Sequence, residues 1–411
     1  MHTILLGLIV LAFVLIVLED VIHLNKAKST LFIGTLVWIL AFVFPEHSVE
    51  HIQEGLNENL LDIATLWLFL MAAMTFVAYL NQQGLITQLV YRLLPGRLTL
   101  RKLMILMSLL ALLFSSLADN ITASLIMLSL LSSLQLDQKT VLKFATLIVF
   151  AVNSGGVSLI TGDVTTLMIF LAGKVSITDL FLLVIPAVSG VMVLALLLMW
   201  GANEEVQLPK FKRPIATGDK FIALLFLLTI LSTLFMSVAF SVPPVLTFLF
   251  GLSLMFMVHR FIYRSEKKPN VLEYVREIEF DTLLFFLGVL LLVGMLKELS
   301  VLDYLPQLYS LMPVYMANFI VGILSALVDN VPLTAAILKS GIEMTTADWL
   351  GLTYAVGVGG SILVIGSAAG VIALSKLQQL TFITYLRFVH WLLVAYTLGY
   401  IAVMLFSRLS S

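Results

Sequence analysis

Residues 115–124 read SSLADNITAS, and residues 325–334 read SALVDNVPLT. Each stretch carries an Asp-Asn pair in the middle of a long apolar segment, 102–134 in the first case and 314–342 in the second. The four residues are Asp119, Asn120, Asp329 and Asn330. A charged side chain at the centre of a bilayer costs at least about 2.5–3.5 kcal/mol. The two pairs therefore need a structural or a functional reason.

The composition is that of a membrane protein. Hydrophobic residues make up 61% of the chain and charged residues 11%, which is far from the average of soluble domains. The apolar segments are 3–18, 29–44, 61–80, 102–134, 141–173, 180–200, 220–240, 244–260, 280–297, 314–342, 349–375 and 386–407. Many of them approach the roughly 17–25 residues that a helix needs to cross a bilayer. We therefore expect an all-α polytopic membrane protein.

Some classes of function are excluded by the composition. The chain contains no cysteine, so disulfides, thiolate-bound metals and thiol chemistry are ruled out. The net charge of −1 gives no support for nucleic-acid binding. No cofactor is expected apart from transported ions, and the expected partner is the lipid bilayer.

The lysines and arginines orient the predicted segments. With the N-terminus outside and with 102–134 and 314–342 as re-entrant hairpins, all but four of the 23 basic residues fall on the cytoplasmic side, as the positive-inside rule requires. The exceptions are Lys174, Lys297, Lys339 and Arg408, of which Lys339 is expected to reach the outer interface. An outer loop is expected to hold Glu46, Glu50, Glu54 and Glu58. The prediction is ten full crossings, two hairpins and both termini outside.

The two halves of the chain match each other. The run NSGGVSLITGDVTT at 153–166 corresponds to GVGGSILVIGSAAG at 357–370, and TLWLFL at 65–70 corresponds to TLLFFL at 282–287. Five crossings precede the second half, so its segments run in the opposite direction. The predicted division is a first repeat at 1–209, a cytoplasmic linker at 210–219 and a second repeat at 220–411. Inverted repeats with interrupted helices are typical of secondary transporters.

Three carboxylates lie deep in apolar segments: Asp119, Asp163 and Asp329. Glycines that could break the two matching spans are Gly155, Gly156, Gly162, Gly359, Gly360 and Gly366. Nearby hydroxyls that could bind a cation are Ser154, Thr165, Thr166, Ser361 and Ser367. The repeat is asymmetric, because Asp163 aligns with Ser367. A site with three acids opposes a large dianion and favours a small cation that competes with protons.

The chain resembles the NhaD-type sodium/proton antiporters of the ion transporter superfamily. The resemblance rests on SSLADNITASLIM, NSGGVSLITGDVTTLM, SALVDNVPLTAAI and VGVGGSILVIGSAAGVIAL. It implies a transporter, not an enzyme, that exchanges cytoplasmic Na⁺ or Li⁺ for external H⁺ in the bacterial inner membrane. It also implies a homodimer in which a transport domain moves against a scaffold like an elevator. The implied ion ligands are Asp119, Asn120, Asp163, Asp329 and Asn330, with Ser154, Thr165, Thr166, Ser361 and Ser367.

Three other readings stay open at this point. An arsenite carrier of the same superfamily is not excluded, because arsenite is neutral at pH 7, whereas a dicarboxylate carrier is opposed by the three acids. An intramembrane aspartyl protease needs a Gly-x-Gly-Asp motif, and Ile160 replaces its first glycine here. A non-transporting scaffold leaves the three carboxylates without a role.

Overall fold

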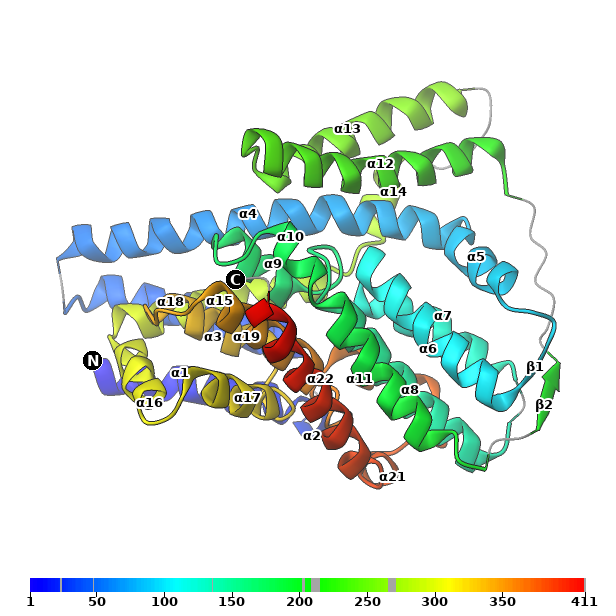
Figure 1. Cartoon of the computed structure of the whole chain (residues 1–411). Helices are drawn as coiled ribbons and strands as arrows, with labels where there is room; N and C mark the ends of the chain where they lie inside the picture. Colours follow the sequence, from blue (N-terminus) through cyan, green and yellow to red (C-terminus); the bar gives the residue numbers. More distant parts are fainter. Residues whose placement is uncertain are drawn as a thin grey trace.

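The chain folds almost entirely into helices, as Figure 1 shows. The computed structural model describes residues 1–22, 24–46, 48–134, 136–201, 204–207, 215–264 and 271–409. The helices of the first half are α1 (His2–Val17), α2 (Glu19–Ile22), α3 (Lys26–Val43), α4 (Val49–Gln82), α5 (Leu85–Leu93), α6 (Leu100–Leu117), α7 (Asn120–Ser132), α8 (Gln138–Gly156), α9 (Val164–Leu171), α10 (Ile177–Phe181) and α11 (Val184–Leu198). The first half of the predicted linker 210–219, residues 210–214, lies outside the described residues.

The second half is also built from long and short helices. They are α12 (Thr217–Phe240), α13 (Pro244–Ile262), α14 (Val271–Arg276), α15 (Phe280–Glu298), the 3₁₀ turn η1 (Val301–Tyr304), α16 (Leu305–Ser310), α17 (Val314–Leu324), α18 (Asn330–Lys339), α19 (Thr346–Gly359), α20 (Ala368–Lys376), α21 (Phe382–Leu386) and α22 (Val389–Leu409). Among the described residues, eight helical stretches are long and apolar enough to cross a membrane. The prediction of a polytopic helical membrane protein is confirmed at this level.

One element departs from the all-α expectation. Strand β1 (Arg97–Thr99) pairs antiparallel with β2 (Glu205–Gln207), with Leu98 opposite Val206. The two strands form a small ribbon at the end of the molecule where α5 and α6 are joined (Figure 1). Three residues per strand are too few to give a visible alternation in the sequence.

The prediction that four glutamates lie in an outer loop is wrong for three of them. Helix α4 begins at Val49 and has 34 residues, so Glu50, Glu54 and Glu58 are helical and only Glu46 lies in a loop. Ser48 caps the helix by accepting a hydrogen bond from the His51 N–H, and Glu50 stands in the first turn, where the helix dipole favours an acid. The charged part of α4 has its apolar residues, Val49, Ile52, Leu56 and Leu60, spaced one helical turn apart among polar ones, so no continuous apolar run marks it in the sequence.

All four long or broken apolar segments divide into two helices. Helix α6 ends at Leu117 and α7 begins at Asn120, while α8 ends at Gly156 and α9 begins at Val164. In the second half, α17 is followed by α18 and α19 by α20. The two halves use the same cross-link: Ser115 Oγ donates to the Val152 carbonyl at 2.7 Å, and Ser325 Oγ donates to the Val356 carbonyl at 3.0 Å.

The helices form two packed groups that share the cavity described below. In the first group, α3 packs on α15, and α4 packs on α13, α14 and α15. A Cβ on Gly34 would lie 2.8 Å from the Gly288 carbonyl oxygen, so only glycine permits this approach of α3 to α15. Trp38 Nε1 donates to the Leu291 carbonyl at 2.9 Å and fixes the same pair. The second group contains α6 to α9, α11, α17, α19, α20 and α22.

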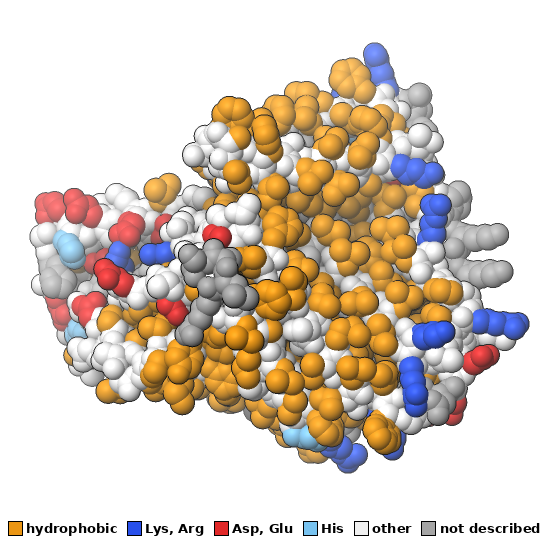
Figure 2. All heavy atoms as spheres, viewed as in Figure 1, with side chains coloured by type: hydrophobic (Ala, Val, Ile, Leu, Met, Phe, Trp, Pro, Cys, Tyr) orange, Lys and Arg blue, Asp and Glu red, His pale blue; other side chains and the backbone are white. Residues whose placement is uncertain are grey.

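Charged side chains separate to opposite ends of the molecule. Figure 2 shows acidic groups at the end where α4 begins, basic groups at the opposite end, and a wide hydrophobic belt between them. Glu46 lies at the acidic end, where the backbone N–H of His2 and the N-terminal amine lower the pKa of its carboxyl. Lys339 also lies on this side, and its Nζ contacts Asn59 Oδ1 at 2.8 Å and Asp62 Oδ2 at 3.1 Å on α4.

Candidate functional site

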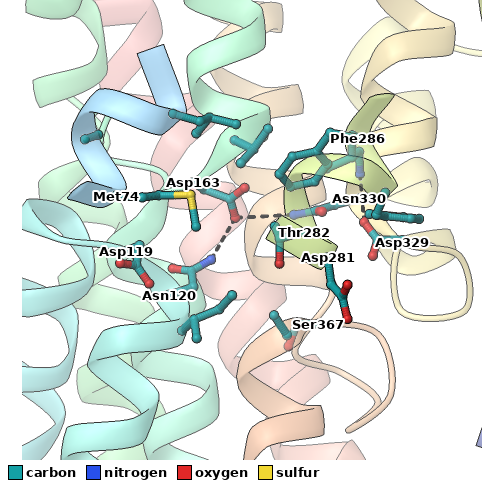
Figure 3. A pocket seen from close by; sticks show the side chains of 18 of the residues that line it. Met74, Asp119, Asn120, Asp163, Asp281, Thr282, Phe286, Asp329, Asn330 and Ser367 are labelled. Atoms are coloured by element: carbon teal, nitrogen blue, oxygen red, sulfur yellow. Dashed lines mark hydrogen bonds between the residues drawn. The ribbon is translucent and has the colours of Figure 1, made fainter. Parts of the chain in front are cut away.

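Four helix N-termini meet at one cavity between the two groups of helices. Their N-cap side chains are Asp119 on α7, Asp163 on α9, Asp329 on α18 and Ser367 on α20. Each accepts a hydrogen bond from a backbone N–H in the first turn of its helix, as N-cap residues do. The cavity has a volume of about 200 Å³ and is drawn in Figure 3.

Asp163 lies at the centre of this arrangement. Its Oδ2 accepts hydrogen bonds from Asn120 Nδ2 at 2.9 Å and from Asn330 Nδ2 at 3.3 Å. Its Oδ1 accepts from the N–H of Thr165 at 3.0 Å and from the hydroxyl of the same residue at 3.1 Å. The structure thus brings the two Asp-Asn stretches onto one carboxylate that is only 8% exposed, although their asparagines lie 43 and 167 residues from Asp163 in the sequence.

The other two carboxylates differ in their surroundings. Asp119 accepts both the N–H and the hydroxyl of Thr122, at 2.7 and 2.8 Å. In Figure 3 its carboxylate lies on the far side of Asn120 from Asp163. Asp329 accepts the Val331 N–H at 3.2 Å with one oxygen, and its other oxygen accepts from Lys26 Nζ at 3.1 Å.

The predicted glycine breaks lie where backbones approach each other closely. A Cβ on Gly156 would lie 2.7 Å from Asn120 Oδ1 and 3.0 Å from the Asp163 Cβ. A Cβ on Gly162 would meet the backbone of Gly156, and a Cβ on Gly366 would meet the carbonyl of Gly360. Gly155 and Gly359 have the same restriction against α6 and α17, respectively. These glycines let the chain turn beside the carboxylates without filling the cavity.

The predicted hydroxyl ligands do not all reach the cavity. Ser367 lines it, whereas Ser154, Thr165, Thr166 and Ser361 do not. Thr166 donates to the Gly156 carbonyl and Ser361 to the Val358 carbonyl, so both satisfy the helix breaks. Ser154 Oγ is buried and has no hydrogen-bond partner among the described residues.

Sequence reasoning missed several residues of the cavity. Asn153 lines it and is 1% exposed; its Nδ2 donates to Ser367 Oγ at 2.9 Å, while its Oδ1 has no hydrogen-bond partner in the described part of the chain. A buried, unpaired carbonyl oxygen is a ready ligand for a cation. Its signal was present, because Asn153 opens the NSGG run. The other missed lining residues with polar side chains are Glu19, Asn25, Lys26, Asp281 and Thr282.

The charge of the cavity wall favours a cation. Among its described lining residues, five are carboxylates and one is an amine. The acids are Glu19, Asp119, Asp163, Asp281 and Asp329, and the amine is Lys26. An anion with several negative charges would meet a net negative wall, whereas a small hard cation would find oxygen ligands.

Comparison with known proteins agrees with this chemistry. A sequence model of the citrate transporter family (CitMHS) matches residues 13–357. The chain is 31% identical to the Na⁺/H⁺ antiporter NhaD of Vibrio cholerae, over 97% of this chain and 91% of that protein. It is 32% identical to NhaD of Vibrio parahaemolyticus, over 89% and 96% of the two chains. It is also 29% identical to sodium/proton antiporter 2 of Arabidopsis thaliana, over 92% and 93%. The predicted resemblance is confirmed, and the matched families are transporters, not enzymes.

Proposed function

The chain belongs to the citrate transporter (CitMHS) family and to the NhaD-type Na⁺/H⁺ antiporters, and we propose that it exchanges cytoplasmic Na⁺ for external H⁺. The observation that carries this proposal is the cavity in which Asp163 is held by an asparagine from each hairpin. A secondary transporter typically binds its ion at such a junction of broken helices.

The mechanism proposed is competition for buried carboxylates. Asp163 is buried, and its hydrogen-bond donors in the described part of the chain, Asn120, Thr165 and Asn330, are all neutral. A buried carboxylate is costly unless a cation or a proton neutralises it. Na⁺ bound by Asp163 with the free Oδ1 of Asn153, or H⁺ bound by Asp163, gives a site of the same charge. Because one ion excludes the other, exposing the site alternately to the two sides produces exchange.

Asp119 has a different role in this proposal. Both of its oxygens are engaged by Thr122, so it contributes negative potential and caps α7 without contacting the ion. Asp329 faces the cavity and is the second candidate for direct contact.

We also propose an inverted repeat, an elevator-type movement and a membrane orientation for the protein. The matching Ser115 and Ser325 bonds, and the matching helix pairs, support an inverted repeat with two re-entrant hairpins and two glycine-broken spans. The group with α3, α4 and α15 would be the scaffold, and the group with the hairpins would move against it like an elevator. The basic end in Figure 2 would face the cytoplasm of a bacterial inner membrane. Li⁺ as a second substrate and a homodimer complete the proposal.

Citrate is the alternative that the family description suggests. A citrate carrier needs donors for several carboxylates, and the described cavity wall supplies one amine against five acids. We therefore place citrate behind Na⁺.

The direct test uses everted membrane vesicles from cells that lack other antiporters. Respiration acidifies the vesicles, a trapped dye reports the internal pH, and NaCl, LiCl or KCl is then added. We expect Na⁺ or Li⁺ to alkalinise the vesicles with the wild-type protein and not with Asp163→Asn. Asp137→Asn is the matched control, because Asp137 caps α8 at an exposed site. A wild-type protein that responds to no cation across the pH range would overturn the proposal.

A further inference from the structure

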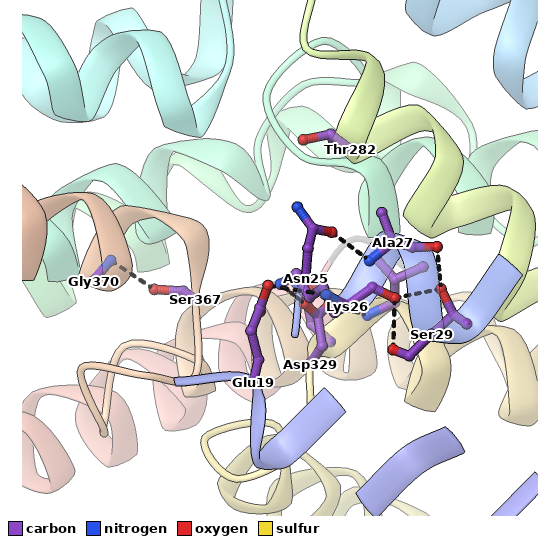
Figure 4. A network of polar contacts seen from close by, with 12 residues as sticks. Glu19, Asn25, Lys26, Ala27, Ser29, Thr282, Asp329, Ser367 and Gly370 are labelled. Atoms are coloured by element: carbon purple, nitrogen blue, oxygen red, sulfur yellow. Dashed lines mark hydrogen bonds and ion pairs between the residues drawn. The ribbon is translucent and has the colours of Figure 1, made fainter. Parts of the chain in front are cut away.

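Lys26 is a cation on α3 of the first group, and it binds a carboxylate at the start of α18, a helix that lies between α15 of the first group and α9 and α19 of the second. Its Nζ lies 3.1 Å from Asp329 Oδ2, at the N-terminus of α18. The ammonium also stands 4.6 Å from the centre of the Phe285 ring on α15. The two side chains are partly buried, at 30% and 19% exposure. Figure 4 shows Lys26 reaching from the start of α3 to Asp329.

The position of Lys26 is fixed on its own side of the cavity. It is the first residue of α3, and its N–H donates to Glu19 Oε1 at 3.0 Å. The neighbouring Asn25 caps α3 and donates through Nδ2 to Asp281 Oδ2 at 2.9 Å. Since α3 is packed tightly on α15 by Gly34 and Gly288, the ammonium is held by the scaffold and not by the hairpin.

We propose that the Lys26 ammonium substitutes for the transported cation. It binds Asp329 when the cavity holds neither Na⁺ nor H⁺. This inference rests on the proposed antiport. In the empty protein the ion pair joins hairpin α18 to scaffold helix α3. Na⁺ bound in the cavity displaces the ammonium, and H⁺ held at Asp163, as proposed above, lowers the negative charge that attracts it. Either event removes this link between α18 and α3, while the Lys339 contacts between α18 and α4 remain.

This arrangement addresses a requirement of any antiporter. Exchange is coupled only if the carrier crosses with Na⁺ or with H⁺ and does not cross empty. An ion pair that forms only in the empty state supplies that condition, because separating the two charges in a partly buried site is unfavourable. The other charged groups facing this part of the cavity are Glu19 and Asp281, and both are acids. Among the described lining residues, no second basic side chain can replace Lys26 at Asp329.

The test uses purified protein in liposomes, with the membrane voltage clamped by K⁺ and valinomycin. Two quantities are measured: the protons moved per Na⁺ during downhill Na⁺ efflux, and the exchange of radioactive Na⁺ for unlabelled Na⁺. In Lys26→Gln we expect protons per Na⁺ to fall to less than half of the wild-type value, because the empty carrier now returns. The half-saturating Na⁺ concentration should fall roughly fivefold, because a competitor has been removed. Na⁺/Na⁺ exchange should persist, since it involves only loaded states.

Three further variants make the result specific. Lys28→Gln removes an exposed lysine two residues further along α3 and should behave as wild type. Lys26→Arg keeps the positive charge and should keep the coupling. Lys26→Met keeps the length and the apolar stem beside Phe285, and should reproduce Lys26→Gln.

The outcomes separate this inference from the proposed function. If wild type and Lys28→Gln both move no protons in exchange for Na⁺, the antiport itself is wrong and the inference falls with it. If they exchange normally and Lys26→Gln and Lys26→Met keep the wild-type proton count, antiport stands and the inference is overturned. Loss of Na⁺/Na⁺ exchange, or of folding, in both variants would also overturn it, because the lysine would then be needed in every state.

Discussion

The two Asp-Asn tips of the cavity, Asp119–Asn120 and Asp329–Asn330, have the same sequence and the same N-cap role in different surroundings. Three residues after each aspartate stands Thr122 in the first tip and Pro332 in the second. Thr122 gives Asp119 two donors. Proline has no N–H, so Asp329 is capped instead by the Val331 N–H and receives no hydroxyl.

The difference leaves one carboxylate satisfied by its own helix and the other open to an exchangeable cation. Asp119 has its oxygens engaged within one turn of α7, whereas Asp329 has an oxygen available for Lys26. The asparagines stay equivalent, since both donate to Asp163. The two tips thus share their N-cap and asparagine geometry, and they differ in the partners of their aspartates, Thr122 at the first tip and Lys26 at the second.

The strongest contrast should come from removing each charge separately. Asp329→Asn should raise the half-saturating Na⁺ concentration by about tenfold, because the lost charge faces the cavity. Asp119→Asn should change it by less than about threefold, because both oxygens of Asp119 are already engaged by Thr122 and an asparagine can still cap α7. The measurement is a NaCl titration of vesicle alkalinisation. Equal effects of the two variants would contradict the comparison.

Thr122→Val tests whether the first tip is held by its own helix. The variant keeps the N–H and the shape of the side chain and removes the hydroxyl that donates to Asp119. The free energy of unfolding should therefore fall by about 1–2 kcal/mol. The thermal midpoint in detergent measures this loss. Thr140→Val is the control, because Thr140 follows the exposed cap Asp137 at the same spacing. A midpoint as little changed as in that control would show that the Thr122 hydroxyl is dispensable.

Pro332→Thr should make the second tip more like the first. The new N–H and hydroxyl would engage both oxygens of Asp329, as Thr122 does at Asp119, and would compete with Na⁺ as well as with Lys26. The half-saturating Na⁺ concentration should therefore rise by about two- to threefold. Pro332→Ala restores the N–H without the hydroxyl and should give an intermediate value. The same vesicle titration reports both variants, and wild-type values in both would argue against proline as the cause of the asymmetry.

Asp137 is an N-cap aspartate outside the cavity, and its replacement should have the smallest effect of these variants. Hydrogen bonds from Thr140 hold the pKa of its carboxyl below the ordinary value. A lowered pKa gives stability above the unfolded pKa that is lost as the pH falls through the folded pKa. Asp137→Asn should therefore cost less than about 1 kcal/mol at neutral pH, and the difference should vanish between about pH 5 and pH 3. A thermal-midpoint difference that does not depend on pH would disprove this.

The residues of the candidate site that could be predicted from the sequence are polar side chains and glycines within apolar segments. Asp119, Asp163 and Asp329 are conspicuous in apolar runs, and glycine pairs mark the breaks beside them. Lys26 was assigned to a cytoplasmic loop, because nothing local shows that it meets a carboxylate 303 residues away. The charged turns of α4 were missed because their apolar residues recur every three to four positions among charged ones and do not form a continuous apolar run.

Helix α4 also fixes the depth of the cavity. It crosses the whole molecule in Figure 1, and Met74 is one of its residues that line the cavity wall. At about 1.5 Å per residue, Met74 lies about 12 Å along α4 from Gln82, where the helix ends, and about 18 Å from Asp62, the last carboxylate of its charged part. An ion at this depth is separated from the acidic side by the larger share of the membrane voltage. The step that joins the cavity to that side should therefore carry most of the voltage dependence of transport.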